Sequence, residues 1–136
     1  MMKVVVNGAL GKMGQETVNA VHCEPDLEMV ASIDRGNDLA DTIKTTHPDV
    51  VVDFTHPSCV KQNVLTILSH GANAIIGTTG LSEADLMEID AVAKANGLGA
   101  LVIPNFAIGA VLLMTFAAEA AKYMPKVEII EYHHDK

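Results

Sequence analysis

Short apolar runs alternate with segments of helical periodicity along the first hundred residues of the chain. Continuous runs rich in Val and Ile predict buried strands at residues 4–6, 28–33, 50–54, 73–76 and 99–103. Between these runs, apolar residues recur at three- and four-residue spacing, as in the segment from Val60 to Leu68, which predicts helices. Short strands that each lead into a helix predict an α/β fold with a doubly wound parallel sheet.

The first strand runs directly into a turn with three glycines, and a helical pattern follows. Strand, glycine turn and helix together are typical of a phosphate-binding turn. Gly8 allows a tight turn, Gly11 lets a pyrophosphate approach the backbone, and Gly14 lets the helix lie close to the strand. The spacing is G-x-x-G-x-x-G rather than the commoner G-x-G-x-x-G, and the motif alone also fits a plain glycine turn in an α/β protein.

The second predicted strand ends at an acidic residue, Asp34, which lies 20 residues after Gly14. An acidic residue near this distance binds the ribose hydroxyls in dinucleotide-binding proteins. Arg35 follows at once, and because a guanidinium attracts a 2′-phosphate, the pair predicts that both NADH and NADPH bind. A solvated turn is the other interpretation of this pair. The first strand, the three glycines and the acidic residue occur in the order and at about the spacing of a dinucleotide-binding fold. Together they favour a Rossmann-like dinucleotide-binding domain.

Polar residues also follow the later strands, at the edge where the carboxyl ends of a parallel sheet meet. These polar loops are at 55–56, 77–80 and 104–106. The hydroxyls of Thr78 and Thr79 and the amide of Asn105 are suited to a nicotinamide carboxamide and its ribose. Each loop taken singly also fits ordinary turn chemistry. Two of the helices have expected caps: Ser58 for the helix after the third strand, and Ser82 with Asp85, a variant capping box, for the next.

The last thirty residues have a different pattern from the rest of the chain. Residues 108–123 are apolar on nearly all sides, which predicts a helix that is buried or that packs against another domain. Residues 126–132 alternate and predict a sixth strand with one wet face, which leads to His133 and His134. We therefore expect a dinucleotide-binding domain over residues 1–106 and the start of a second, truncated domain over residues 107–136.

The charge and the residue composition of the chain limit the kinds of molecule that it is expected to bind. The 136 residues carry a net charge of −8 and only 4% aromatic residues, which argues against binding to nucleic acid or to anionic membranes. The two cysteines lack C-x-x-C spacing and no third ligand accompanies the His pair at a fixed spacing, so neither a disulfide framework nor a metal site is expected. A cytoplasmic protein fits this cysteine usage and the absence of a signal-peptide pattern.

Six motifs occur in order along the chain: GALGKMG, an acidic-Arg pair, DFTHP, GTTG, PNFAIG and EYHH. This series resembles the 4-hydroxy-tetrahydrodipicolinate reductase family, also called dihydrodipicolinate reductase, over nearly all 136 residues. The resemblance implies NADH- or NADPH-dependent reduction of a cyclic imine dicarboxylate on the diaminopimelate route to lysine, in a homo-oligomer, by family pattern a tetramer. It implies His133 as the catalytic acid/base and His134 as a substrate-binding residue. The cofactor contacts that it implies are Gly8, Ala9, Leu10, Gly11, Lys12, Met13, Gly14, Asp34, Arg35, Gly77, Thr78, Thr79, Pro104, Asn105 and Phe106.

The end of the sequence departs from the family pattern. The pattern H-H-x-x-K places the catalytic lysine at position 137, and Lys136 is one place short. We therefore expect an amino-terminal half that binds cofactor and is itself inactive. Two other functions remain open from the sequence: another NAD(P)-dependent dehydrogenase with a similar first domain, such as a homoserine or sugar dehydrogenase, and a non-catalytic NAD-binding sensor or regulatory module.

Overall fold

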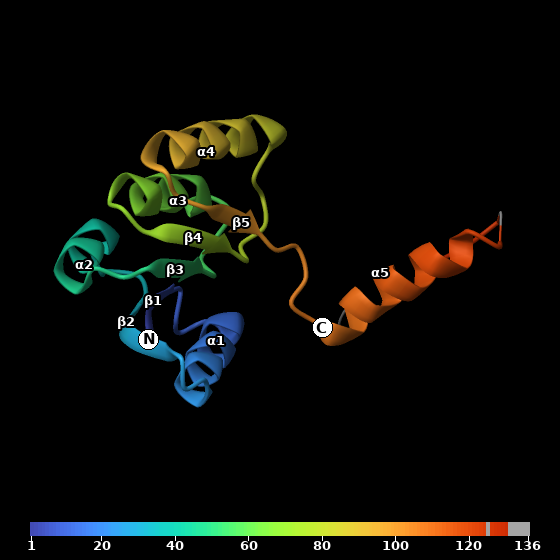
Figure 1. Cartoon of the computed structure of the whole chain (residues 1–136), viewed down its shortest axis with the longest axis horizontal. Helices are drawn as coiled ribbons and strands as arrows, with labels where there is room; N and C mark the ends of the chain where they lie inside the picture. Colours follow the sequence, from blue (N-terminus) through green and yellow to red (C-terminus); the bar gives the residue numbers. More distant parts are fainter. Residues whose placement is uncertain (125, 131–136) are drawn as a thin grey trace. The chain divides into compact units, whose positions relative to one another are not determined.

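The computed structural model describes residues 1–124 and 126–130, and the chain divides into two compact units, Met1–Pro104 and Asn105–Lys136. The first unit contains a five-stranded parallel sheet (Figure 1) with strand order β2-β1-β3-β4-β5. The strands are β1 (Met2–Asn7), β2 (Leu27–Ile33), β3 (Val50–Asp53), β4 (Asn73–Ile76) and β5 (Ala100–Val102). The helices of this unit are α1 (Lys12–Cys23), α2 (Leu39–Thr46), α3 (Val60–Ser69) and α4 (Glu83–Asn96).

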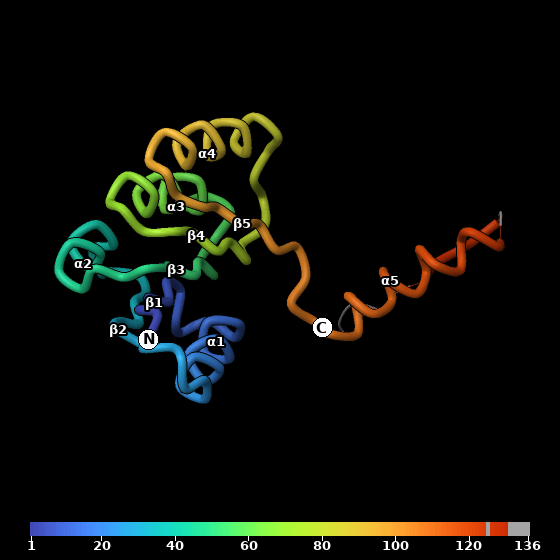
Figure 2. The backbone as a smooth tube through the Cα atoms, viewed as in Figure 1, coloured from blue at the N-terminus to red at the C-terminus, as the bar shows by residue number. Residues whose placement is uncertain are grey.

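Helices cover both faces of the sheet, so the predicted doubly wound α/β fold is confirmed. Successive side chains along each strand point to opposite faces of the sheet, and this places the apolar residues in two separate clusters. Val5 and Val51 face the cluster built with α2, α3 and α4, whereas Val4 and Val6 face the cluster that includes Val21 of α1. Figure 2 shows α1 on one side of the sheet and α3 and α4 on the other. The helix after β1 packs on one face of the sheet, whereas the helices after β2 and β3 pack on the other. Because β1 and β3 are neighbours in the sheet, the chain leaves these two adjacent strands toward opposite faces. Ligands bind at such a point in open α/β sheets.

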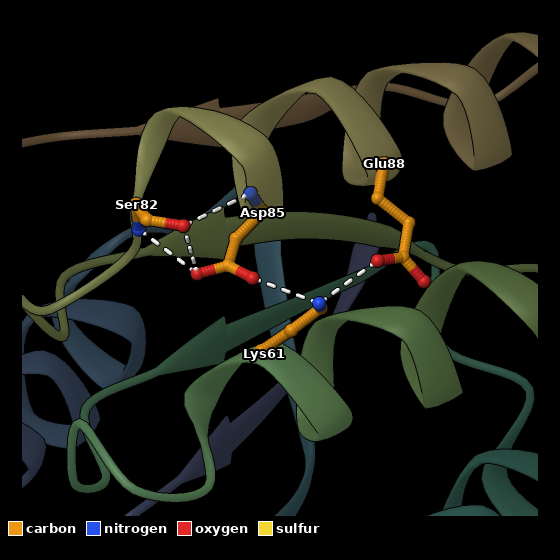
Figure 3. Close-up of polar contacts among 4 residues, drawn as sticks. All are labelled: Lys61, Ser82, Asp85 and Glu88. Atoms are coloured by element: carbon orange, nitrogen blue, oxygen red, sulfur yellow. Dashed lines mark hydrogen bonds and ion pairs between the residues drawn. The ribbon is translucent and has the colours of Figure 1, made fainter.

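Ion pairs and a capping box join α3 to α4 (Figure 3). Lys61 Nζ of α3 lies 2.8 Å from Asp85 Oδ1 and 2.8 Å from Glu88 Oε2, both on α4. Ser82 Oγ accepts from the backbone N–H of Asp85, and Asp85 Oδ2 accepts from the backbone N–H of Ser82, so the predicted capping box forms. The hydrogen bonds from Lys61 and from Ser82 lower the pKa of Asp85 below its ordinary range.

The predicted cap of α3 is wrong. The N-cap position is Cys59 rather than Ser58, and no side-chain cap hydrogen bond forms there. Ser58 Oγ lies instead 2.9 Å from His56 Nδ1, and the backbone N–H of Ser58 donates to the same nitrogen. The Ser58 hydroxyl is bonded to the His56 ring, and Ser58 lies one position before the N-cap of the helix that begins at Val60.

The second unit contains one helix, α5 (Ile108–Ala121), among its described residues. No residue of α5 is buried, although the helix is apolar on nearly every side. The strand expected at residues 126–132 is wrong over residues 126–130, which form no strand, because no described strand pairs with them; residues 131 and 132 lie outside the described residues. Across the described ranges, no helix combines the length and the apolar character needed to cross a membrane.

Candidate functional site

The glycine turn after β1 is built around two positions that accept no side chain. Gly8 has a φ of +83°, and a Cβ there would overlap the carbonyl oxygen of Phe54. A Cβ at Gly14 would overlap the Gly8 carbonyl oxygen, because α1 crosses directly over the turn. The tight turn and the close helix packing that the sequence predicted are therefore both confirmed as structural requirements.

Gly11 differs from the other two glycines of the turn. Its backbone is extended, with φ −70° and ψ 163°, and a Cβ added there would meet only the Gly8 carbonyl oxygen, at 3.4 Å. The fold therefore does not require a glycine at this position. Gly11 is also the N-cap of α1 and provides no side-chain cap, so the first N–H groups of the helix keep their capacity to bind an anion.

Asp34 fixes the glycine turn to the end of β2. Its Oδ2 accepts from the backbone N–H of Leu10 at 2.9 Å, and its Oδ1 accepts from the backbone N–H of Arg35 at 2.7 Å. These hydrogen bonds, from Arg35 first and then Leu10, and the nearby Arg35 charge lower the pKa of Asp34 below its ordinary value, so the residue is a carboxylate at neutral pH. Each oxygen keeps a further acceptor position, because a carboxylate oxygen accepts more than one hydrogen bond.

A cleft of about 520 Å³ opens at the carboxyl ends of β1, β2 and β3. It brings together five of the residues that the sequence predicted for the cofactor site: Gly8, Leu10, Gly11, Asp34 and Arg35. Its other lining residues are Asn7, Gly36, Asn37, Leu39, Phe54, Thr55, His56, Cys59 and Asn63. The cleft lies at the point where β1 and β3 are neighbours and the chain changes faces of the sheet.

The side of the cleft formed by the ends of β3 and α3 carries further polar groups. From the sequence, the loop at 55–56 was expected at this edge of the sheet, but neither of its residues was named as a cofactor contact, and Asn63 was not expected there. His56 Nδ1 accepts from the backbone N–H of Ser58, so Nε2 is the donor of the neutral ring. Asn63 Nδ2 donates to Asp53 Oδ2 at 3.0 Å and to Thr55 Oγ1 at 3.1 Å. The signal for His56 and Thr55 was their place directly after a buried strand, whereas Asn63 sits inside a helical pattern and gave no signal of its own.

Some of the predicted cofactor residues do not line this cleft. Thr78 is buried, and its hydroxyl donates to Asp53 Oδ1 and accepts from the backbone N–H of Thr55, so it serves the structure of the loops. A Cβ at Gly77 would overlap the ring of Phe54, so that glycine is required by packing. The remaining predicted residues of the first unit that do not line the cleft are Ala9, Lys12, Met13, Gly14, Thr79 and Pro104.

The other predicted site residues lie in the second unit. Asn105 and Phe106 belong to that unit, and Asn105 Nδ2 lies 3.8 Å from Met114 Sδ. The catalytic and substrate-binding predictions, His133 and His134, lie outside the described residues. Among the residues that the structure does describe, no group of three or more His, Cys, Asp or Glu side chains is placed to hold a metal ion.

Comparison with known proteins gives consistent similarities. Residues 2–106 match the family described as "Dihydrodipicolinate reductase, N-terminus". The chain is 45% identical to the 4-hydroxy-tetrahydrodipicolinate reductase of Syntrophomonas wolfei, over 98% of this chain and 58% of that protein. It is 47% identical to the reductase of the same name from Coxiella burnetii, over 99% of this chain and 56% of that protein.

A solved structure gives the same similarity at the level of the fold. The dipicolinate-bound dihydrodipicolinate reductase from Paenisporosarcina sp. TG-14 superimposes with a TM-score of 0.89 and 39% identity, over 99% of this chain and 59% of that one. The chain therefore spans a little more than half the length of the relatives that it matches.

Proposed function

The chain belongs to the dihydrodipicolinate reductase family, and from that premise we propose that it binds NADH or NADPH in the cleft at the carboxyl ends of β1, β2 and β3. The turn at Gly11 and the N-terminus of α1 would hold the pyrophosphate. Asp34 and Arg35 would bind the adenosine ribose or its 2′-phosphate. His56, on the other side of the cleft, would offer a ring N–H to the rest of the dinucleotide.

One observation carries this proposal: Gly11 is a glycine that the protein itself does not need. Gly8 and Gly14 are required by backbone contacts, whereas a Cβ at Gly11 meets only one atom, at 3.4 Å. That Cβ would belong to a residue that lines the cleft, at the N-terminus of a helix with no side-chain cap. A side chain at this position would point at a bound ligand rather than at the rest of the protein. A glycine here therefore fits close approach of a pyrophosphate to the backbone.

The substitution Gly11→Val tests the proposal directly. We expect the folded variant to lose NADH and NADPH binding in calorimetric titrations, because the branched side chain would occupy the place of the pyrophosphate. Gly99→Val is the matched control, since a Cβ at Gly99 also meets a single atom, Asn73 Oδ1 at 3.5 Å, and Gly99 does not line the cleft. An unchanged dissociation constant in folded Gly11→Val would show that the glycine turn is structural only.

For the reaction of the complete protein, we propose reduction of a cyclic imine dicarboxylate on the diaminopimelate route to lysine. Bound NADH or NADPH supplies a hydride, and the product then needs a proton. The proposed proton donor is His133, since an imidazole has a pKa near neutrality, and His134 is proposed to bind a substrate carboxylate. We propose a cytoplasmic homo-oligomer for the full-length form.

For the 136-residue sequence alone, we propose cofactor binding without turnover, because the relatives carry a further two fifths of their length outside the matched region. The measurement is NADH oxidation in the presence of the enzymatically generated imine substrate, with a full-length relative as positive control. Steady-state oxidation by the purified chain above the rate without protein would contradict this proposal and leave cofactor binding intact.

A further inference from the structure

Asp53, at the carboxyl end of the central strand β3, is the most completely bonded side chain at this edge of the sheet. Its side chain is fully buried, with 0% exposure, and it does not line the cleft. Oδ2 accepts from Asn7 Nδ2 at 2.9 Å and from Asn63 Nδ2 at 3.0 Å. Oδ1 accepts from Thr55 Oγ1 at 2.7 Å and Thr78 Oγ1 at 2.8 Å, and from the backbone N–H of Thr55 at 3.2 Å.

These partners come from four separate segments of the chain. Asn7 directly precedes Gly8 of the glycine turn, and Thr55 belongs to the loop after β3. Asn63 lies on α3, and Thr78 belongs to the loop after β4. One carboxylate therefore joins the glycine turn, two further loops and a helix, and three of its four partner residues line the cleft.

Within the described part of the chain, no ion pair reaches Asp53. Burial of a carboxyl group is unfavourable unless its oxygens are hydrogen-bonded, and buried networks of this kind fix one arrangement of their members. All described buried side-chain nitrogen and oxygen atoms have a partner, so this network is complete. A fold that needed only an apolar strand end could place Val at residue 53, as it does at the three preceding positions of β3.

We infer that Asp53 is a positioning residue of the nucleotide site: it holds the glycine turn, the Thr55 loop and α3 in the relative arrangement that binds the dinucleotide, without touching it. The inference rests on the proposed NADH or NADPH binding for its functional consequence. Its structural part, that one buried carboxylate sets the order of the Gly8–Gly11 turn through Asn7, stands without any nucleotide.

The test is Asp53→Asn in the 136-residue chain, which keeps the shape and replaces one oxygen by an NH₂ group. At the Oδ2 position that NH₂ faces the Nδ2 groups of Asn7 and Asn63, whose amides must turn over before they can accept. At the Oδ1 position it faces the backbone N–H of Thr55, which can only donate. Amide exchange is measured by NMR without nucleotide, with Ala74 in β4 as the reference. We expect exchange at Leu10 and Gly11 to quicken about tenfold more than exchange at Ala74, because a change of this size corresponds to the loss of one hydrogen bond to a charged group.

Two further measurements connect the turn with binding. We expect the NADH dissociation constant of Asp53→Asn to rise about tenfold, for the same reason. Thr78→Val removes one hydroxyl that donates to Asp53, and it should also quicken amide exchange at Leu10, a residue that Thr78 does not contact. Thr66→Val is the control, because the hydroxyl of Thr66 bonds only within α3, and it should not change exchange at Leu10. Thr78→Ser should restore the wild-type exchange rate.

The outcomes separate the two proposals. In Asp53→Asn and in Thr78→Val, amide exchange at Leu10 and Gly11 could change no more than exchange at Ala74. That result would show that Asp53 is merely structural and would overturn the inference. Should Asp53→Asn fail to fold, Thr78→Val alone decides in the same way. Wild-type protein that does not bind NADH would overturn the proposed function, and the nucleotide-free exchange rates would still decide the role of Asp53. Faster exchange at the turn with unchanged NADH affinity would overturn the functional part of the inference.

Discussion

The carboxylate of Asp34, at the edge of the cleft, has two roles. It holds the backbone N–H of Leu10, which belongs to the glycine turn, and it is proposed to accept hydrogen bonds from the ribose. From the sequence only the second task was expected, because a contact between residues 24 positions apart leaves no local pattern. The consequence is that removal of Asp34 affects the turn as well as the recognition of the ribose.

We therefore predict that Asp34→Ala weakens the binding of both cofactors, and that of NADH more. Loss of the Leu10 tie disorders the turn for either cofactor, and loss of a charge-assisted bond to the ribose adds roughly another tenfold for NADH. Arg35→Ala should weaken NADPH alone, because only NADPH carries a 2′-phosphate. Calorimetric titration of both cofactors measures this. Equal losses for both cofactors in both variants would refute the division of roles.

Single residues also mark the limit of what the sequence predicted about the site. The residues of the glycine turn and Asp34 were found because their spacing reflects a local requirement of a strand, a turn and a helix. Asp53 was not assigned to any role, since an acidic residue after three valines has the same appearance whether it is exposed or at the centre of a buried network. Its partners lie up to 46 positions away in the sequence, and only the folded sheet brings them together.

At the scale of helices and strands, the sequence predicted most of the first unit because the apolar periodicity and the turn residues agree with each other. β3 and β4 fall within one residue of their expected ends, and the Ser82–Asp85 capping box forms as expected. The expected Ser58 cap was wrong for a tertiary reason, because the Ser58 hydroxyl is hydrogen-bonded to the imidazole of His56. Leu86 has helical spacing with the buried Ile89 and Ala93, yet it is 40% exposed.

The start of α4 gives a prediction at this scale. Ser82→Ala removes the hydroxyl that accepts from the backbone N–H of Asp85, and we expect it to lower the free energy of unfolding by about 1 kcal/mol, as for other N-cap serines. Urea unfolding followed by circular dichroism measures the change. Ser69→Ala, at the exposed end of α3, is the control and should change stability by less than about 0.5 kcal/mol. Equal effects of the two substitutions would show that the capping box contributes nothing.

The chain as a whole consists of two units that differ in how their apolar residues are used. The first unit encloses its Val and Ile side chains in two clusters on the faces of the sheet. In the second unit, every residue of α5 has solvent exposure above that of a core position, including Phe116 at 65% and Ile108 at 78%. The sequence predicted an all-round apolar helix that needs a covering partner, and the described residues of the second unit do not bury it.

Exposed apolar area of this kind promotes association between protein molecules. We predict that the 136-residue chain associates as its concentration rises, in sedimentation velocity experiments. The double variant Leu112→Gln and Phe116→Gln should reduce association, because residues four apart share one face of α5. NADH affinity is the control and should be unchanged in this variant, since neither residue lines the cleft. A chain that sediments as a monomer at every concentration, or a double variant that associates as strongly as the wild type, would show that α5 is not the surface responsible.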